Sequence, residues 1–180
     1  MTPRLFESCF LAPFGETDHS DLGLNFGPKG LEKPSTIRAM SQGPKKQIAV
    51  YSDDSATRAA IISAVGTRVA TDVPEHEMHE FATGPALRAF IDKKTIVKKF
   101  PIDLFILDGE AAPEGGLGIA RQLKDEVFNC PPVLAITVRK EDAWLAAWSL
   151  AEKSVVHPID PFTLAHTVAD LLRSTSLATA

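Results

Sequence analysis

The sequence predicts an α/β domain in which five parallel strands alternate with five helices. Between Gln47 and Arg173, short apolar runs alternate with segments of helical periodicity, a pattern typical of βαβ units with right-handed crossovers. The apolar run 102–107 is followed by Asp108 and by a turn that contains Gly109 and Pro113. A carboxylate at the carboxyl end of a buried strand lies where open parallel sheets place their functional groups.

Each predicted strand is a short run rich in aliphatic or aromatic residues, and each is followed by a segment with a helical pattern. The second strand has the weakest pattern of the five. The predicted strands are 47–51, 77–81, 102–107, 133–136 and 154–156. The predicted helices are 55–65, 85–93, 117–127, 141–152 and 161–173.

Acidic residues follow two of these strands. Asp53 comes just after the first strand, and Asp108 comes at the end of the third. If the two strands are neighbours in the sheet, both carboxylates open into one crevice. Carboxylate oxygens in such a place are typical of a hard-cation or phosphoryl site.

The order of elements and acids resembles the receiver domains of two-component response regulators, a flavodoxin-like module that is phosphorylated on aspartate. The resemblance covers roughly residues 46–173. It implies that Asp108 is the phosphoacceptor, and that Asp53, Asp108 and the backbone carbonyl of Glu110 bind magnesium. It also implies that Thr137, at the end of the fourth strand, is the hydroxyl residue that responds to phosphorylation.

The chain departs from the family pattern at several positions. Ser52 stands where the family usually has a second acid, and Ser154 stands where it often has an aromatic switch residue. The loop before Pro113 is one residue longer than usual. His157, followed by proline, replaces a lysine that is a permanent cation. Histidine is mostly neutral at pH 7, although nearby carboxylates favour its charged form.

These departures lead to two expectations about the site. We expect the ring of His157 to lie within hydrogen-bonding or one-water reach of a site carboxylate and to replace the lysine weakly. Because Ser52 removes one acid, we expect weak magnesium binding, since this ion is usually bound by few protein ligands and several waters.

The composition indicates an intracellular protein with one compact domain. The chain has 180 residues and a formal net charge of -4, so it lacks the basic footprint of a nucleic-acid-binding protein. Its two cysteines fit a reducing compartment, and no apolar stretch reaches the roughly 20 residues that span a bilayer. We expect a cytoplasmic, non-enzymatic protein without direct membrane insertion. The predicted extension, domain and tail are 1–45, 46–174 and 175–180.

The N-terminal extension contains many Pro and Gly residues and has no sustained period. It nevertheless carries Phe6, Phe10, Phe14 and Phe26, and aromatic side chains favour burial. We expect these residues to bind a partner, with the segment folding on a larger assembly. Packing against its own domain and disorder are the alternatives, and Met40 is an alternative start.

Two further patterns have both an ordinary and a functional interpretation. His76 and His79, with their neighbouring glutamates, miss the spacing of a helical zinc site, so a solvated segment is expected there. Trp144 and Trp148 lie one helical turn apart on the same face. They are either part of the core or exposed partner-binding residues.

Two functions therefore compete. The motifs around Asp108 and His157 resemble the stand-alone atypical receivers of actinobacteria, a group linked to the proton-pumping NADH dehydrogenase, respiratory complex I. This resemblance implies a non-enzymatic accessory subunit, peripheral to the membrane through its complex. The alternative is a signalling switch that takes a phosphoryl group from a histidine kinase onto Asp108. The missing lysine favours the first, and retention of Asp53, Asp108 and Thr137 favours the second.

Overall fold

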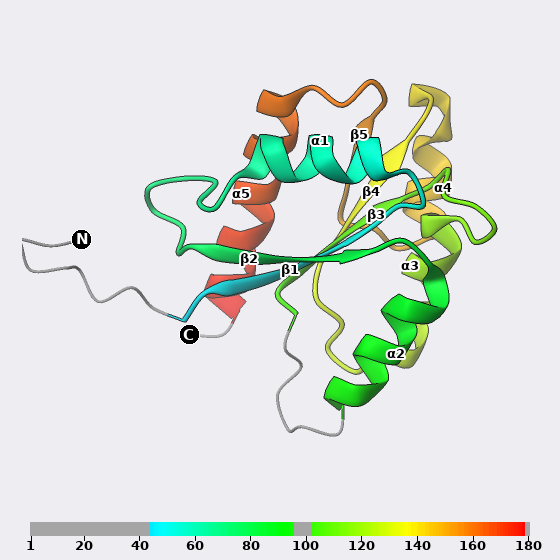
Figure 1. Cartoon of the computed structure of the whole chain (residues 1–180), viewed down its shortest axis with the longest axis horizontal. Coiled ribbons are helices and arrows are strands. Elements are labelled where there is room, and N and C mark those ends of the chain that lie inside the picture. The colour runs from blue at the N-terminus through cyan, green and yellow to red at the C-terminus, as the bar shows by residue number, and fades with distance from the viewer. Residues whose placement is uncertain (1–43, 96–101, 179–180) are drawn as a thin grey trace, which may run out of the picture. The chain divides into compact units, whose positions relative to one another are not determined.

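The computed structural model describes residues 44–95 and 102–178 and confirms the predicted α/β architecture. The sheet is parallel, with the strand order β2-β1-β3-β4-β5 (Figure 1). Its strands are β1 (Lys46–Tyr51), β2 (His76–Phe81), β3 (Leu104–Asp108), β4 (Val133–Thr137) and β5 (Lys153–Val156). The helices are α1 (Ser55–Val65), α2 (Gly84–Thr95), α3 (Gly116–Glu126), the 3-10 helix η1 (Lys140–Asp142), α4 (Ala143–Trp148) and α5 (Pro161–Ala178).

Helices cover both faces of the sheet (Figure 1). Side chains of a strand point alternately to its two faces. On β1, Ile48 and Val50 therefore pack in the core that includes α1 and α5, whereas Ala49 and Tyr51 pack in the core that includes α2 and α3. Every residue of β3 and β4 is buried, which explains why these strands are almost continuously apolar.

The topology brings the ends of β1 and β3 together. These strands are neighbours, although β2 lies between them in the sequence. The order of strands reverses here, because β2 lies on one side of β1 and all later strands lie on the other. Tyr51 pairs with Leu107, so Ser52 and Asp108 follow at adjacent strand ends. Open α/β sheets bind ligands at such a switch point.

The fourth helix is shorter than predicted. It ends at Trp148, where a Schellman motif closes it. The N–H of Leu150 donates to the Ala147 carbonyl, and the N–H of Ala151 donates to the Ala146 carbonyl, both at 3.1 Å. Leu150 has a φ of 59°, a conformation in which glycine is usual. Since leucine gives no stop signal, the pattern predicted a longer helix.

His76 is buried, so the predicted solvated segment is wrong at this residue. Its side chain lies at the start of β2, and the residue is only 5% exposed. The ring Nε2 is 2.8 Å from the carbonyl oxygen of Gly66, which requires a proton on Nε2. Among the described residues, Nδ1 has no hydrogen-bond partner. Burial lowers the pKa of His76, because a charged imidazole would lose its hydration.

We expect His76 to make the domain less stable at acid pH. In the unfolded chain an imidazole takes up its proton at a pH of about 6.5. The folded pKa is lower, so just below that pH the unfolded state binds more protons and is favoured. The stabilisation is complete above about pH 6.5 and is lost as the pH falls toward the folded pKa. Urea unfolding at a series of pH values measures this dependence.

His76→Gln should weaken the pH dependence, since its amide can donate to Gly66 without titrating. The matched control is His166→Gln, which changes an exposed histidine of α5. The free energy of unfolding of this control should follow the original chain. The prediction fails if His76→Gln retains the full loss of stability at acid pH.

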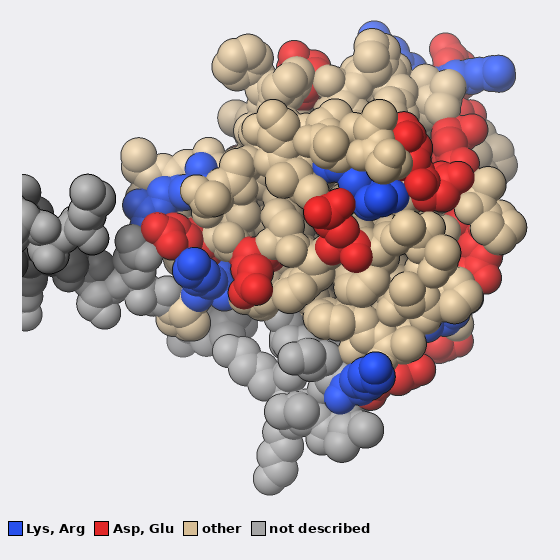
Figure 2. Space-filling model, in the orientation of Figure 1, with Lys and Arg blue, Asp and Glu red and all other residues tan. Residues whose placement is uncertain are grey.

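The described surface carries charges of both signs. On the face in Figure 2, acidic and basic side chains are interspersed among other residues, and the basic ones form no continuous stripe among the described residues. That face therefore lacks the continuous positive potential of a nucleic-acid-binding surface. None of the described helices combines the length and the hydropathy needed to cross a membrane.

Candidate functional site

Asp108 lies at the carboxyl end of β3 and is only 4% exposed. Both of its carboxylate oxygens accept hydrogen bonds. The hydroxyl of Ser52 donates to Oδ2 at 2.8 Å, and the backbone N–H of Glu110 donates to Oδ1 at 3.1 Å. The orientation of the carboxylate is therefore fixed from two sides by its own chain.

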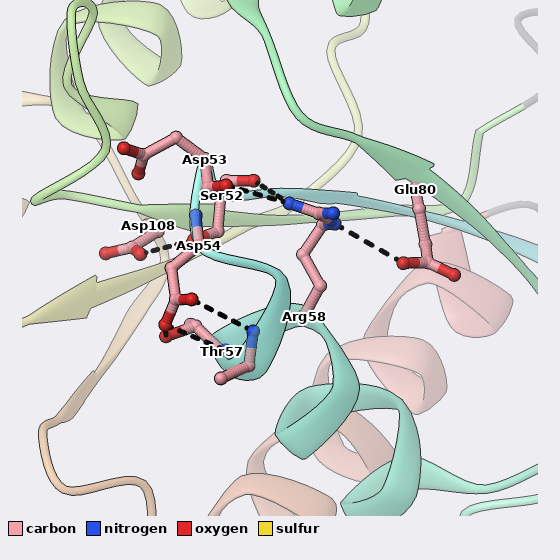
Figure 3. A network of polar contacts seen from close by, with 8 residues as sticks. Ser52, Asp53, Asp54, Thr57, Arg58, Glu80 and Asp108 are labelled. Carbon is pink, nitrogen blue, oxygen red and sulfur yellow. Dashed lines mark hydrogen bonds and ion pairs between the residues drawn. The ribbon is translucent and has the colours of Figure 1, made fainter.

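Ser52 is a site residue in its own right. Its side chain is fully buried, and its Oγ also accepts the N–H of Asp54 at 3.2 Å. The hydroxyl proton is thus directed to Asp108 (Figure 3). The sequence identified Ser52 only as the position of a missing acid. The structure adds that a neutral hydrogen-bond donor contacts the predicted phosphoacceptor in place of a second negative charge.

The two acids after Ser52 have different surroundings. Asp54 caps α1 and accepts the N–H of Ala56 at 3.0 Å, the N–H of Thr57 at 3.1 Å and the Thr57 hydroxyl at 2.8 Å. The hydrogen bond from Ala56 and those from Thr57 lower the pKa of Asp54. Asp53 is exposed, and Figure 3 shows its side chain directed away from the α1 cap. Asp53 is thus the acid of this pair that remains open to an incoming cation.

The donor set fits magnesium with few protein ligands. The open carboxylate of Asp53, the fixed carboxylate of Asp108 and the adjacent backbone of Glu110 offer only oxygen, which this ion prefers. Among the described residues, no group of three or more His, Cys, Asp or Glu side chains is arranged to bind a metal. A bound magnesium ion would therefore keep most of its waters.

Thr137 and His157 lie at the next two strand ends. Thr137 ends β4 and is 2% exposed, and its carbonyl oxygen accepts the N–H of His157 at 2.8 Å. Within the described part of the chain, the His157 ring has no direct hydrogen bond to Asp108 or Asp53, so contact through one water stays a prediction. Ser154 is exposed on β5.

Sequence comparison decides the family. An uncharacterized response regulatory protein of Mycobacterium tuberculosis strain H37Rv is 49% identical over 128 residues, which cover 71% of this chain and 92% of that protein. The chain belongs to the response regulator receiver family. A protein described in the same words from strain CDC 1551 / Oshkosh matches this receiver equally well. No family model matches the chain.

Solved structures agree with this receiver in fold. The BeF3-activated receiver domain of DrrB from Thermotoga maritima has a TM-score of 0.56 and 19% identity, over 72% of this chain and 99% of that one. A CheY-like receiver domain protein from Methanospirillum hungatei has a TM-score of 0.58 and 16% identity, over 75% and 99%. At these identities the comparison supports the flavodoxin-like fold.

The loop that leads from Asp108 of the receiver to α3 is fixed at its far end through Glu114. The hydroxyl of Tyr51 donates to the Glu114 carbonyl oxygen at 2.6 Å, and Arg88 of α2 donates to its carboxylate at 2.8 Å. Burial of Tyr51, assisted by the charge of Glu114, raises the pKa of the phenol, so it remains a donor at neutral pH. No motif in the sequence indicated this contact, which joins three elements.

Gly116 lets the receiver's third helix begin directly against Asp108. A Cβ atom at this position would overlap the Asp108 carbonyl oxygen and would lie 2.7 Å from its carbonyl carbon. Only glycine permits such a close approach of two backbones.

We expect Gly116→Ala to destabilise the receiver by about 1 to 3 kcal/mol, because the new methyl group displaces the end of β3. Gly118→Ala is a matched control on the same helix, where an added Cβ meets no atom within 4 Å. It should stabilise the fold by about 0.5 to 1 kcal/mol, since alanine is the better helix former. Urea denaturation measures both changes. Equal effects of the two substitutions would contradict the proposed close approach.

The tryptophan pair of the receiver is exposed rather than part of the core. Trp144 and Trp148 on α4 are 66% and 52% exposed. The core alternative is therefore wrong, and both side chains are available for contact. The other predicted partner-binding residues, Phe6, Phe10, Phe14 and Phe26, lie outside the described residues.

Proposed function

We propose that this receiver is a phosphorylatable signalling switch that accepts a phosphoryl group on Asp108 from a histidine kinase. The geometry of the Asp108 carboxylate carries the proposal. It lies at the sheet's switch point with one oxygen bound by Ser52 and the other by the Glu110 N–H. This arrangement orients a carboxylate nucleophile, and phosphoryl transfer relies on positioning and electrostatic stabilisation more than on covalent chemistry.

The reaction forms one bond and breaks one. A carboxylate oxygen of Asp108 attacks the phosphorus of the donor, and the bond from phosphorus to the donor group breaks with its electron pair leaving on that group. The acyl phosphate of Asp108 is the product. Magnesium, when bound, would neutralise charge on the phosphoryl oxygens, and Asp53, Asp108 and the Glu110 carbonyl are the groups that would bind it.

Thr137 is the residue that we propose responds to the phosphoryl group. It is buried at the end of β4, next to β3 in the sheet, and its backbone is hydrogen-bonded to His157. A hydroxyl that turned toward the acyl phosphate would move the start of the loop between β4 and α4. That loop leads to the exposed Trp144 and Trp148, so partner affinity can change with phosphorylation.

Intact-mass analysis tests the proposal. The full chain is incubated with acetyl phosphate and magnesium, and one added phosphoryl group is expected on a fraction of the molecules. Omitting magnesium should lower the yield. If no acyl phosphate forms at any magnesium concentration, the signalling proposal is wrong and a purely binding role takes its place.

A second candidate function is that of a protein-interaction subunit, which the exposed Trp144 and Trp148 favour. Respiratory complex I remains a predicted partner from the resemblance alone, since the names of the relatives above refer to response regulation. Co-purification of the full chain, but not of a chain lacking residues 1–40, with the NADH dehydrogenase would support it. Equal recovery of both chains would contradict the role given to the N-terminal extension.

A further inference from the structure

Arg58 of α1 contacts the backbone of the loop that carries Ser52 and Asp53. Its Nη1 donates to the Ser52 carbonyl oxygen at 2.7 Å and to the Asp53 carbonyl oxygen at 3.2 Å. Its Nε donates to a carboxylate oxygen of Glu80 on β2 at 3.4 Å. The Arg58 side chain is only 15% exposed, so these contacts occupy a partly buried position beside the site.

The contact is unusual because two consecutive carbonyl oxygens meet one donor. Consecutive carbonyls in an extended strand point in opposite directions. Here the chain bends at Asp53, and both oxygens turn toward Arg58. Two such oxygens repel each other unless a donor lies between them, and a guanidinium is charged at every physiological pH. Arg58 therefore stabilises the bend by donating to both oxygens.

This bend sets the direction of the side chains in the candidate site. Figure 3 shows the Asp53 carboxylate on the opposite side of the loop from the guanidinium, the side on which Asp108 also lies. The same backbone places the Ser52 hydroxyl 2.8 Å from Asp108. Among the described residues, Arg58 makes no hydrogen bond or ion pair with either carboxylate, so any influence on the site passes through the backbone of the loop.

We propose that Arg58 is a positioning residue, which fixes the loop between β1 and α1 so that Asp53 is directed at the cation position and Ser52 at Asp108. This inference rests on the proposed function of the site. The two interactions of Arg58, with Glu80 and with the carbonyl oxygens, contribute unequally to the position of the loop. Glu80 is 51% exposed in its side chain, and such surface ion pairs contribute little. Both bonds to the carbonyl oxygens are shorter, and the one to Ser52 is partly buried, so these bonds carry the positioning effect.

Three substitutions separate these contributions. Arg58→Met keeps most of the aliphatic length and removes every donor, Arg58→Lys keeps the charge with a different donor geometry, and Glu80→Gln removes only the ion pair. Arg121→Met is the matched control. Arg121 also joins a carboxylate, Asp125 at 2.9 Å, to a backbone carbonyl, that of Trp148 at 3.2 Å, but it does so on α3, away from the loop.

Three measurements on the full chain test the role of the loop. Hydrogen exchange of the Asp54 amide, followed by NMR, reads the hydrogen bond to Ser52 Oγ without any metal or phosphodonor. A magnesium titration, followed by the amide shifts of the site, then gives the half-saturation concentration. Acyl phosphate formation is measured at low and at saturating magnesium, which separates a loss of cation binding from a loss of chemistry.

For Arg58→Met we expect about tenfold weaker magnesium binding, the size of effect typical of residues that orient a metal ligand. Exchange of the Asp54 amide should become faster, and saturating magnesium should restore most of the phosphorylation rate. Arg58→Lys should be intermediate, whereas Glu80→Gln and Arg121→Met should stay close to the original chain. Thermal unfolding of each variant identifies any global loss of structure.

The inference is overturned if folded Arg58→Met and Arg58→Lys retain the original Asp54 exchange and magnesium affinity, or if Arg121→Met changes them as much. Failure of the proposed function looks different. In that case the original chain forms no acyl phosphate at all, and the Asp54 exchange still decides whether Arg58 positions the loop.

Discussion

Replacing Asp108 by asparagine is expected to abolish acyl phosphate formation while the receiver remains folded. An amide lacks the nucleophilic oxygen of a carboxylate. It retains one acceptor for the Glu110 N–H, and its NH2 group can donate to Ser52 Oγ, so the local hydrogen bonds reorganise. Charge-assisted bonds give way to neutral ones, a change of about 1 kcal/mol in the free energy of unfolding. Intact-mass analysis with acetyl phosphate and urea denaturation measure the two effects.

Asp54→Asn is the matched control for this experiment. It makes the same chemical change two positions from Ser52, at an acid that caps α1. Asparagine is also a good capping residue, so stability should change little and phosphorylation should continue. If the Asp108→Asn protein is labelled as well as the control, Asp108 is not the acceptor.

Replacing His157 by lysine is expected to increase the rate of acyl phosphate formation about tenfold or more. A permanent cation at the end of β5 would stabilise charge on the transferring phosphoryl group, and a single electrostatic donor in an active site typically contributes about 100- to 1,000-fold. An imidazole is not a permanent cation and supplies less, and within the described residues the His157 ring has no direct hydrogen bond to the site carboxylates. The rate with acetyl phosphate at saturating magnesium is the measurement.

His157→Gln gives the comparison for that gain. It removes the imidazole ring without adding a charge, so its rate should equal that of the original chain or fall below it. A rate for His157→Lys no higher than that of His157→Gln would show that this position does not act on the phosphoryl group.

The sequence was sufficient to predict the sheet and the strand ends that carry the site. Short apolar runs identified β1, β3 and β4, since these strands are largely buried and almost continuously apolar. Asp53 and Asp108 follow directly from those strand ends. Local patterns contain this information because strand burial and the parallel topology together determine where such residues lie.

The contacts that orient the site required the structure. Arg58 donates to two backbone carbonyl oxygens, and Tyr51 donates to that of Glu114. A backbone carbonyl is the same group in every residue, so the sequence pattern does not reveal which one a side chain contacts. Ser52 was visible only as a departure from a pattern. The burial of His76 on β2 and the exposure of Trp144 on α4 depend on how strands and helices pack together, which the pattern of a single element does not contain.

Mapping the modified residue tests the central claim most directly. The full chain is phosphorylated with acetyl phosphate and magnesium, reduced with borohydride, which converts an aspartyl phosphate to homoserine, and digested for peptide mass analysis. We predict homoserine at position 108 and an unchanged residue at position 53. A phosphoryl group found instead on Ser52 or Thr137, or homoserine only at another aspartate, would contradict the assignment of Asp108 as the phosphoacceptor.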